Sequence, residues 1–164
     1  MALVYLGVGS NLGDRQENIR KALIFLKENE AIDVLQCSKI IETVPEGVPP
    51  QGDFLNGVIE IETQLMPLEL LSALKNIERR LGRSKKIGSS DPRTIDLDIL
   101  FYNDVVIVNG KNLTIPHPRA AKRQFVLEPL AEIAPDYKHP VLKKAISEIY
   151  GDFQNENISK NLTA

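Results

Sequence analysis

Residues 91–102 of this chain read DPRTIDLDILFY, a stretch in which polar and apolar side chains alternate from Thr94 onwards. Such alternation is typical of a β-strand, because successive side chains of a strand point to opposite faces of the sheet. One set is apolar and is expected to face the core: Ile95, Leu97, Ile99 and Phe101. Asp96 and Asp98 share the other face, with Cα atoms about 7 Å apart, from two rises of roughly 3.4 Å. The stretch therefore predicts a half-buried strand that carries a pair of carboxylates.

The aspartate pair has an ordinary interpretation and a functional one. Two aspartates on a strand are commonly just its solvent face. However, aspartate is depleted in strands and like charges on one face repel each other, so a bound cation would explain the pair. Mg²⁺ prefers oxygen ligands and is typically held by one or two carboxylates together with substrate phosphates. Asp96 and Asp98 are therefore our candidate magnesium ligands, and no thiolate or histidine cluster in the sequence suits zinc.

Basic residues gather on both sides of the acidic strand. One group lies between residues 79 and 93 and the other between residues 119 and 123: Arg79, Arg80, Arg83, Lys85, Lys86 and Arg93, then Arg119, Lys122 and Arg123. Such groups are often solvated helix ends. Beside two aspartates they also supply the cations that phosphate oxygens need. The residues thus predict a metal–phosphate site and leave its chemistry open.

Two common nucleotide-binding motifs do not account for this site. The sequence contains no Walker A pattern. The segment GVGSNLG at 7–13 fails as a dinucleotide fingerprint, because Leu12 stands where the third glycine belongs. Its glycines are expected instead to let the end of a strand turn into a loop.

The length and composition indicate one soluble domain. The chain has 164 residues, 43% of them hydrophobic, which suffices for a core without metal or disulfide cross-links. Its single cysteine, Cys37, has no partner for an internal disulfide, so we expect a reducing, cytoplasmic setting. No run approaches the roughly 18 apolar residues of a membrane-spanning helix. The net charge of −2 and the pI of about 5.8 argue against a surface built to bind nucleic acid.

The periodicity along the chain predicts the remaining elements. Strands are expected at residues 3–9, 34–43, 54–63 and 94–102, and helices at 14–30, 67–81, 125–134 and 142–150. Asn109-Gly110 favours a hairpin between residues 105 and 116. The order β-α-β-β-α-β indicates an α+β sandwich with a mainly antiparallel sheet. Residues 1–150 are expected to form this single domain, and the polar residues 151–164 a frayed tail.

Several motifs together resemble one known enzyme family. They are GVGSNLGDR at 7–15, ETVPEG at 42–47, DFLNGV at 53–58, GRSKK at 82–86, DPRTIDLDILFY at 91–102 and LTIPHP at 113–118. In order and spacing they resemble 6-hydroxymethyl-7,8-dihydropterin pyrophosphokinases, from about residue 3 to residue 150. The resemblance implies a ferredoxin-like sandwich with helices on both faces. It also implies an enzyme that transfers pyrophosphate from ATP to the hydroxymethyl group of the pterin in folate biosynthesis and releases AMP.

The resemblance implies roles for individual residues as well. The implied catalytic residues are Arg83, Arg93, Asp96 and Asp98, and the two aspartates hold two Mg²⁺ ions. The implied ATP contacts are Glu78, Arg83, Lys85, Arg93, Ile99, Thr114, His117 and Arg123. The implied pterin contacts are Thr43, Val44, Pro45, Phe54, Asn56 and Phe125.

These contacts have a physical reason in each case. Phe54 and Phe125 would stack on the flat pterin, and Asn56 with the backbone of residues 43–45 would read its amide edge. His117 would touch phosphate instead of acting as a base. By themselves the two phenylalanines suit a core, and the histidine suits a structural turn.

Departures from the family's common pattern concern the loops. Ser90 stands where many members have a tryptophan, and Lys85 stands where they have an arginine. We expect the segments 43–53 and 82–92 to close over bound substrates and exclude water.

Two other functions stay open from the residues alone: a noncatalytic nucleotide-sensing module, and a two-metal phosphodiesterase or nuclease. The negative net charge and the aromatic content of 5% count against the nuclease. We expect a monomer with ATP and the pterin as small-molecule partners, and with neither nucleic acid nor membrane as a partner.

Overall fold

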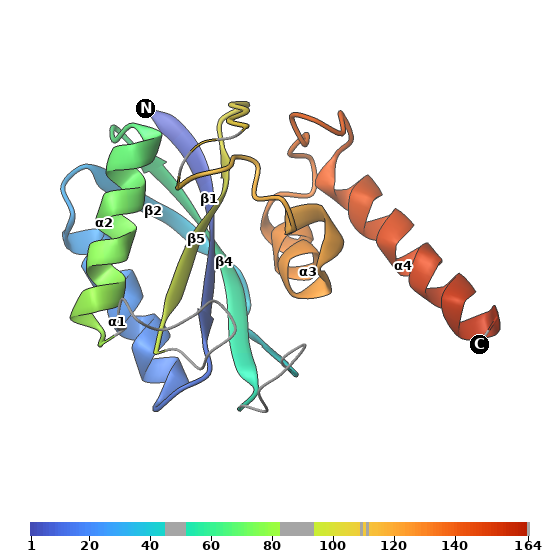
Figure 1. Cartoon of the computed structure of the whole chain (residues 1–164), viewed down its shortest axis with the longest axis horizontal. Helices are drawn as coiled ribbons and strands as arrows, with labels where there is room; N and C mark the ends of the chain where they lie inside the picture. Colours follow the sequence, from blue (N-terminus) through green and yellow to red (C-terminus); the bar gives the residue numbers. More distant parts are fainter. Residues whose placement is uncertain (45–51, 83–93, 109, 111, 164) are drawn as a thin grey trace.

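The structure of the protein is a computed structural model, which describes residues 1–44, 52–82, 94–108, 110 and 112–163 (Figure 1). In chain order its elements are β1 (Ala2–Ser10), α1 (Arg15–Glu28), β2 (Ile32–Cys37), β3 (Ile41–Thr43), β4 (Phe54–Thr63), α2 (Pro67–Arg80), β5 (Asp96–Tyr102), a short 3-10 helix η1 (Ala120–Lys122), α3 (Gln124–Ile133) and α4 (Ile146–Thr163). The predicted order of strands and helices is confirmed from β1 to β5, except that two strands, β2 and β3, replace the one expected at residues 34–43.

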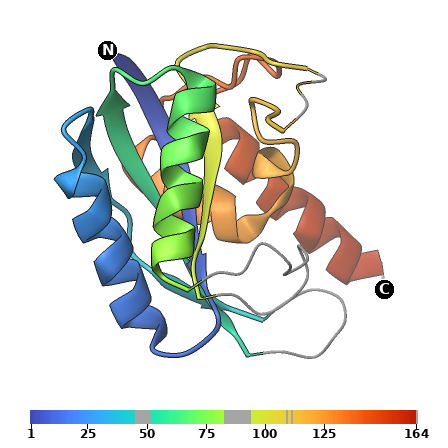
Figure 2. The ribbon, with the colours of Figure 1, turned by 60° about the vertical axis from the view of Figure 1, so that its left-hand side comes forward.

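The strands form an open, five-stranded antiparallel sheet with β1 and β4 inside it. The order along the sheet is β2-β4-β1-β5, and β3 pairs with β4 beyond the end of β2. β1 pairs with β4 along its whole length, from Ala2 opposite Thr63 to Ser10 opposite Leu55. Helices α1 and α2 cover one face, and α3 and α4 lie on the other (Figure 1 and Figure 2). The predicted antiparallel sandwich with helices on both faces is confirmed.

Alternation along the strands builds two separate cores. The first lies between the sheet and helices α1 and α2, and it includes Leu6, Val8, Ile59, Leu74 and Leu97. The second lies between the sheet and helices α3 and α4, and it includes Tyr5, Val58, Leu100, Leu127 and Ile146. Neighbours such as Tyr5 and Leu6 enter different cores, because strand side chains alternate between faces. Full burial of one such aliphatic side chain contributes about 1.5–3 kcal/mol.

A β-bulge between β1 and β5 overturns one prediction. The register moves from Leu6 opposite Ile99 to Tyr5 opposite Phe101, so Leu100 is an extra residue in β5. Beyond this point the alternation of β5 is reversed, and Phe101 packs in the second core beside Leu100. The prediction that Phe101 shares a face with Ile99 is therefore wrong, because a bulge inserts one residue into one strand only.

Residues with known preferences for helix ends account for where α1 and α2 begin and end. The carboxylate of Asp14 caps α1 by accepting a hydrogen bond of 3.1 Å from the backbone N–H of Glu17. The carboxylate of Glu17 pairs with Arg20 within the helix. Helix α2 begins at Pro67, which suits a first turn because its missing N–H would have no helical partner there. The chain leaves this helix through Gly82, whose φ is +93°.

Two predicted elements are shorter in the structure. The strand expected over residues 34–43 is divided into β2 and β3, and between them the hydroxyl of Ser38 accepts a hydrogen bond of 2.9 Å from the backbone N–H of Val58. The hairpin expected between residues 105 and 116 is a single antiparallel bridge between Ile107 and Ile115. Asn109 of its expected turn lies outside the described residues.

The C-terminal segment differs most from expectation. The helix predicted at residues 142–150 begins at Ile146 and continues as α4 to Thr163, so the tail is helical where irregular chain is predicted. Most side chains after Phe153 are exposed, and α4 points away from the sheet (Figure 1). No proline follows Gly151, and the residues beyond it tolerate a helix. Neither α4 nor any other helix in the described ranges is long and apolar enough to cross a membrane.

Candidate active site

The acidic pair lies on the edge strand β5, directly opposite two glycines of β1. Asp98 is the register partner of Gly7, and Asp96 is the register partner of Gly9. Leu97 points into the first core, so both carboxylates lie on the other face of the sheet, as the alternation predicts. Both aspartates are half-buried. Gly7 and Gly9 contribute no side chains beside the carboxylates, and Gly9 is buried beneath its neighbours.

Gly9 has no room for a side chain. A Cβ atom on Gly9 would lie 2.8 Å from Oδ1 of Asn56 and 3.7 Å from Cδ1 of Phe54. The first distance is shorter than real Cβ contacts, so a side chain would displace the amide. Gly7 and Gly9 lie inside β1, as the strand expected at residues 3–9 requires, and the turn expected after it includes Gly13, whose φ is +71°. A glycine within a strand is itself a signal of close approach, and it could have identified this position.

Asn56, Gly9 and Asp96 form one row across three adjacent strands. Gly9 pairs with Asn56 of β4 on one side and with Asp96 of β5 on the other. Paired residues of antiparallel strands share a face, so the amide and the carboxylate stand on either side of Gly9. Their Cα atoms are about 10 Å apart, from two strand spacings of roughly 4.8 Å. Nδ2 of Asn56 donates a hydrogen bond of 2.7 Å to Oγ1 of Thr43, which fixes the orientation of the amide.

The two predicted stacking residues come from different elements on this face. Phe54 begins β4 two residues before Asn56, so both side chains lie on the same face. Phe125 is in the first turn of α3, which packs against β3 and β4. The guanidinium of Arg123 lies 5.2 Å from the ring centroid of Phe125, within the range of a cation–π interaction. Both rings are half-buried, so each is anchored in the protein and keeps some surface for a ligand.

His117 is a hydrogen-bond donor near Asp96 and Arg123. Its backbone N–H donates to the carbonyl oxygen of Leu100 at 2.9 Å, and its Nδ1 accepts a hydrogen bond of 3.1 Å from the backbone N–H of Arg119. Burial lowers the pKa of His117 and the charge of Arg123 lowers it further, while Asp96 acts in the opposite direction. A neutral imidazole whose Nδ1 accepts carries its proton on Nε2. This tautomer suits contact with a phosphate oxygen better than removal of a proton.

Glu78 supports the acidic strand from α2. It is 2% exposed, and its Oε2 accepts a hydrogen bond of 2.8 Å from the backbone N–H of Leu97, between the two aspartates. Its Oε1 lies 3.5 Å from Nζ of Lys75. A buried carboxylate requires such partners to offset its lost hydration. The contact with ATP that the sequence predicts for Glu78 stays a prediction.

The remaining predicted contacts are divided between core, surface and undescribed segments. Ile99 is 3% exposed in the first core, so only its backbone can reach a ligand. Thr114 and Val44 are exposed, and Thr43 is half-buried. Other predicted contacts and loop residues lie outside the described residues: Pro45, Arg83, Lys85, Ser90 and Arg93.

The donor set on β5 fits magnesium. Within the described ranges, no group of three or more His, Cys, Asp or Glu side chains comes together as a metal site. Mg²⁺ does not require such a group, because it takes one or two carboxylates and completes its coordination with water and phosphate oxygens. Asp96 and Asp98 therefore match this ion in the presence of a phosphate-bearing ligand.

The fold and the site together define a small α+β domain with a candidate ligand site over one face of its sheet. One face of its antiparallel sheet presents carboxylates, an imidazole donor and two aromatic rings. The model of the family described as 7,8-dihydro-6-hydroxymethylpterin-pyrophosphokinase matches residues 5–135, and the chain belongs to this family.

Curated relatives contain this domain alone or as part of a longer chain. The 2-amino-4-hydroxy-6-hydroxymethyldihydropteridine pyrophosphokinase of Aquifex aeolicus is 42% identical over 160 residues, which cover 98% of this chain and 95% of the relative. The enzyme of the same name from Bacillus subtilis is 45% identical over 131 residues, with 80% and 77% covered. The folic acid synthesis protein fol1 of Schizosaccharomyces pombe is 41% identical over 167 residues, and the chain spans 22% of it.

Solved structures share the fold. A Plasmodium falciparum HPPK-DHPS structure with pterin and p-hydroxybenzoate superposes with a TM-score of 0.78 at 18% identity, covering 97% of this chain and 44% of that one. An HPPK-DHPS in complex with substrates gives a TM-score of 0.79 at 18% identity, covering 98% and 44%. At this identity the likeness concerns the fold, and it agrees with the antiparallel sandwich described above.

Proposed function

We propose that this protein transfers pyrophosphate from ATP to 6-hydroxymethyl-7,8-dihydropterin in folate biosynthesis, giving the pterin diphosphate and AMP. Family membership over residues 5–135 supports the reaction. The row Asn56–Gly9–Asp96 is the observation that supports a location for the reaction in the fold. In this row a predicted pterin contact and a predicted metal ligand lie on one face of the sheet, on either side of Gly9.

Two Mg²⁺ ions are proposed to bind at Asp96 and Asp98, which lie on one face of β5. When bound, magnesium would neutralise the charge of the triphosphate and of the transferred group. The two aspartates act by holding the cation, and Glu78 fixes the backbone between them through its bond to Leu97 N–H. The packed first core beneath Leu97 keeps this part of the strand rigid.

The triphosphate is proposed to contact His117 and Arg123. His117 supplies a neutral Nε2–H donor, and Arg123 supplies a permanent cation at the start of α3. Both side chains interact electrostatically with each other, and His117 also interacts with Asp96. The contributions of Arg83, Lys85 and Arg93 stay predictions, since these residues lie outside the described ranges.

The pterin is proposed to lie between Phe54 and Phe125, with Asn56 at its amide edge. A flat heterocycle gains from stacking on aromatic rings. The amide of Asn56 has a second N–H and an oxygen besides the donor that it gives to Thr43, and these complement a planar donor–acceptor edge. Gly9 leaves the space in which the amide of Asn56 lies against β1.

The direct test mixes the protein with ATP, Mg²⁺ and 6-hydroxymethyl-7,8-dihydropterin and follows AMP. We expect AMP formation that requires both the pterin and the metal. A protein that binds ATP but forms no pterin-dependent AMP is not this enzyme, and that result would favour a nucleotide-sensing module. A monomeric state and a cytoplasmic location stay predictions, and light scattering tests the first of them.

A further inference from the structure

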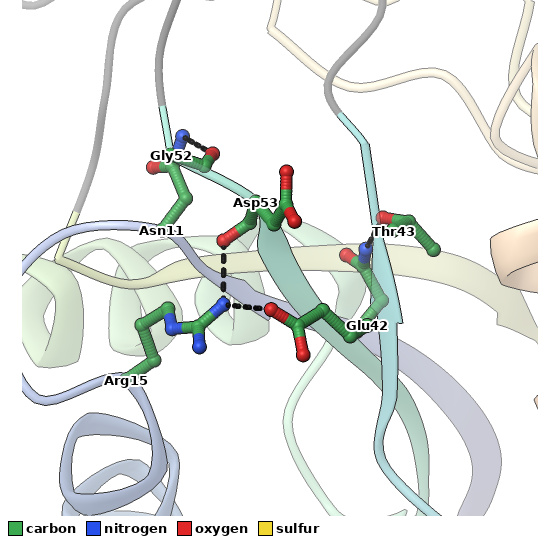
Figure 3. A network of polar contacts seen from close by, with 7 residues as sticks. Asn11, Arg15, Glu42, Thr43, Gly52 and Asp53 are labelled. Atoms are coloured by element: carbon green, nitrogen blue, oxygen red, sulfur yellow. Dashed lines mark hydrogen bonds and ion pairs between the residues drawn. The ribbon is translucent and has the colours of Figure 1, made fainter.

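Arg15 links helix α1 to both strands that lead to the predicted pterin contacts. Its Nη1 donates a hydrogen bond of 3.0 Å to Oε1 of Glu42 in β3, and one of 2.8 Å to the backbone oxygen of Asp53 just before β4 (Figure 3). Arg15 is the first residue of α1, directly after the capping residue Asp14. One side chain thus connects three elements at one end of the sheet.

The two acceptors are each one residue away from a predicted pterin contact. Glu42 precedes Thr43, and Asp53 precedes Phe54. Thr43 and Phe54 are themselves register partners in the pairing of β3 with β4. Arg15 therefore connects the two strands directly beside the pair Thr43–Phe54.

The position of β3 also affects Asn56, the predicted contact for the amide edge of the pterin. Oγ1 of Thr43 accepts the hydrogen bond from Nδ2 of Asn56, so the orientation of Asn56 depends on where β3 lies. β3 is a strand of three residues, and its sheet partner within the described residues is β4. A short edge strand has few bonds of its own, so a charge-assisted bond to Glu42 is a substantial part of what fixes it. Figure 3 shows the guanidinium directed at Glu42 and Asp53 together.

A second contact of the same kind lies beside the first. Nδ2 of Asn11, which follows β1, donates a hydrogen bond of 3.2 Å to the backbone oxygen of Gly52 (Figure 3). Asn11 and Arg15 therefore hold residues 52 and 53 from the end of β1 and the start of α1. Arg15 alone also reaches β3.

From this geometry we infer that Arg15 is a positioning residue for the pterin site: it holds Thr43, Phe54 and Asn56 in register without touching the pterin. The inference rests on the proposed function and assigns to that site a residue outside it. The Arg15–Glu42 ion pair is partly exposed, with side chains 32% and 55% exposed. Exposed pairs contribute little to global stability, so the effect of Arg15 falls on the site and not on folding.

The test compares Arg15→Met and Glu42→Gln with Arg20→Met. Arg20 pairs with Glu17 on the same helix, and its hydrogen bonds to described residues are to Glu17, so Arg20→Met removes an ion pair of α1 away from the site. We expect Arg15→Met to raise the KM for the pterin about tenfold, with the KM for ATP within about twofold, kcat within about threefold and Tm within about 3 °C of wild type. Glu42→Gln should cause a smaller rise, and the double variant no more than Arg15→Met alone. Arg20→Met should match wild type.

Hydrogen exchange of the ligand-free protein gives a measurement that does not need turnover. Arg15→Met should speed exchange at the amides of Ile41–Thr43 and leave β1 unchanged. A pterin KM within twofold of wild type in Arg15→Met, or an equal rise in the KM for ATP, would overturn the inference while leaving the proposed function intact. A wild-type protein without pterin-dependent AMP formation would instead overturn the proposed function, and the positioning of a pterin with it.

Discussion

The two faces of β1 and β5 have opposite compositions at neighbouring positions. Toward α1 and α2 the strands present large apolar side chains that are at most 3% exposed: Leu6, Val8, Leu97 and Ile99. Toward α3 they present the residues of the site: Gly7, Gly9, Asp96 and Asp98. Because strand side chains alternate, one face of this part of the sheet carries the first core and the other carries the candidate site. Substitutions should therefore change stability on the first face and activity on the second.

The largest expected effect is at the acidic pair Asp96 and Asp98, on the face toward α3. Asp96→Asn and Asp98→Asn should each lower the rate of AMP formation about a thousandfold, which corresponds to about 4 kcal/mol of barrier, because the metal loses a charged ligand. The Tm of both variants should stay near that of wild type. Asp33→Asn, an exposed aspartate on β2, is the matched control and should retain full activity. If both site variants retained activity, the two aspartates would have no role in catalysis.

On the packed face, Leu6→Ala should lower the free energy of unfolding by about 3 kcal/mol. Leu6 is fully buried in the first core, and its truncation loses transfer free energy and leaves a cavity. Urea denaturation measures the change. The folded fraction of this variant should keep its kcat within about threefold of wild type. A much larger loss of kcat would mean that the two faces are coupled.

Gly9→Ala tests the close approach of the Asn56 amide to β1. The added methyl group would meet Oδ1 of Asn56 at 2.8 Å, so we expect a pterin KM about tenfold higher, equivalent to about 1.4 kcal/mol. Gly151→Ala is the control, because nothing lies within 4 Å of its added Cβ. This control lies in α4 and should raise stability by up to about 1 kcal/mol without changing KM. Unchanged pterin binding in Gly9→Ala would show that Asn56 moves aside freely.

The smallest expected effect concerns pH and His117. Burial and Arg123 lower the pKa of His117 below its ordinary value of 6.5, so the unfolded chain takes up the proton at higher pH than the folded one. The free energy of unfolding should therefore fall as the pH decreases from about 6.5 towards the folded-state pKa, and this group should have no effect above that window. His117→Gln should weaken this dependence in urea unfolding at about pH 5.5 and 7.5. If the pH dependence were unchanged in His117→Gln, the group responsible would be His139, because burial lowers its pKa as well.

Much of the fold follows from local signals in the sequence. Alternation in β1, β4 and β5, the cap at Asp14 and the stop at Gly82 predict elements that the structure confirms. These signals are local because hydrogen-bonding period and backbone conformation depend on neighbouring residues. The reversed alternation at Phe101 and the helical tail to Thr163 were not predictable in this way, since a bulge depends on the partner strand and a solvated helix leaves no apolar period.

Local sequence signals likewise predict part of the candidate site, and tertiary structure decides the rest. Residue types and spacing predict that Asp96 and Asp98 share one face of a strand, and the motifs resemble those of a pyrophosphokinase family. Tertiary structure alone decides that Gly9 stands between Asn56 and Asp96, and that Arg15 reaches both Glu42 and Asp53. The physical reason is distance along the chain. Alternation relates residues two positions apart. Strand pairing and a long side chain join residues tens of positions apart, and the local sequence pattern does not specify which distant residues become partners.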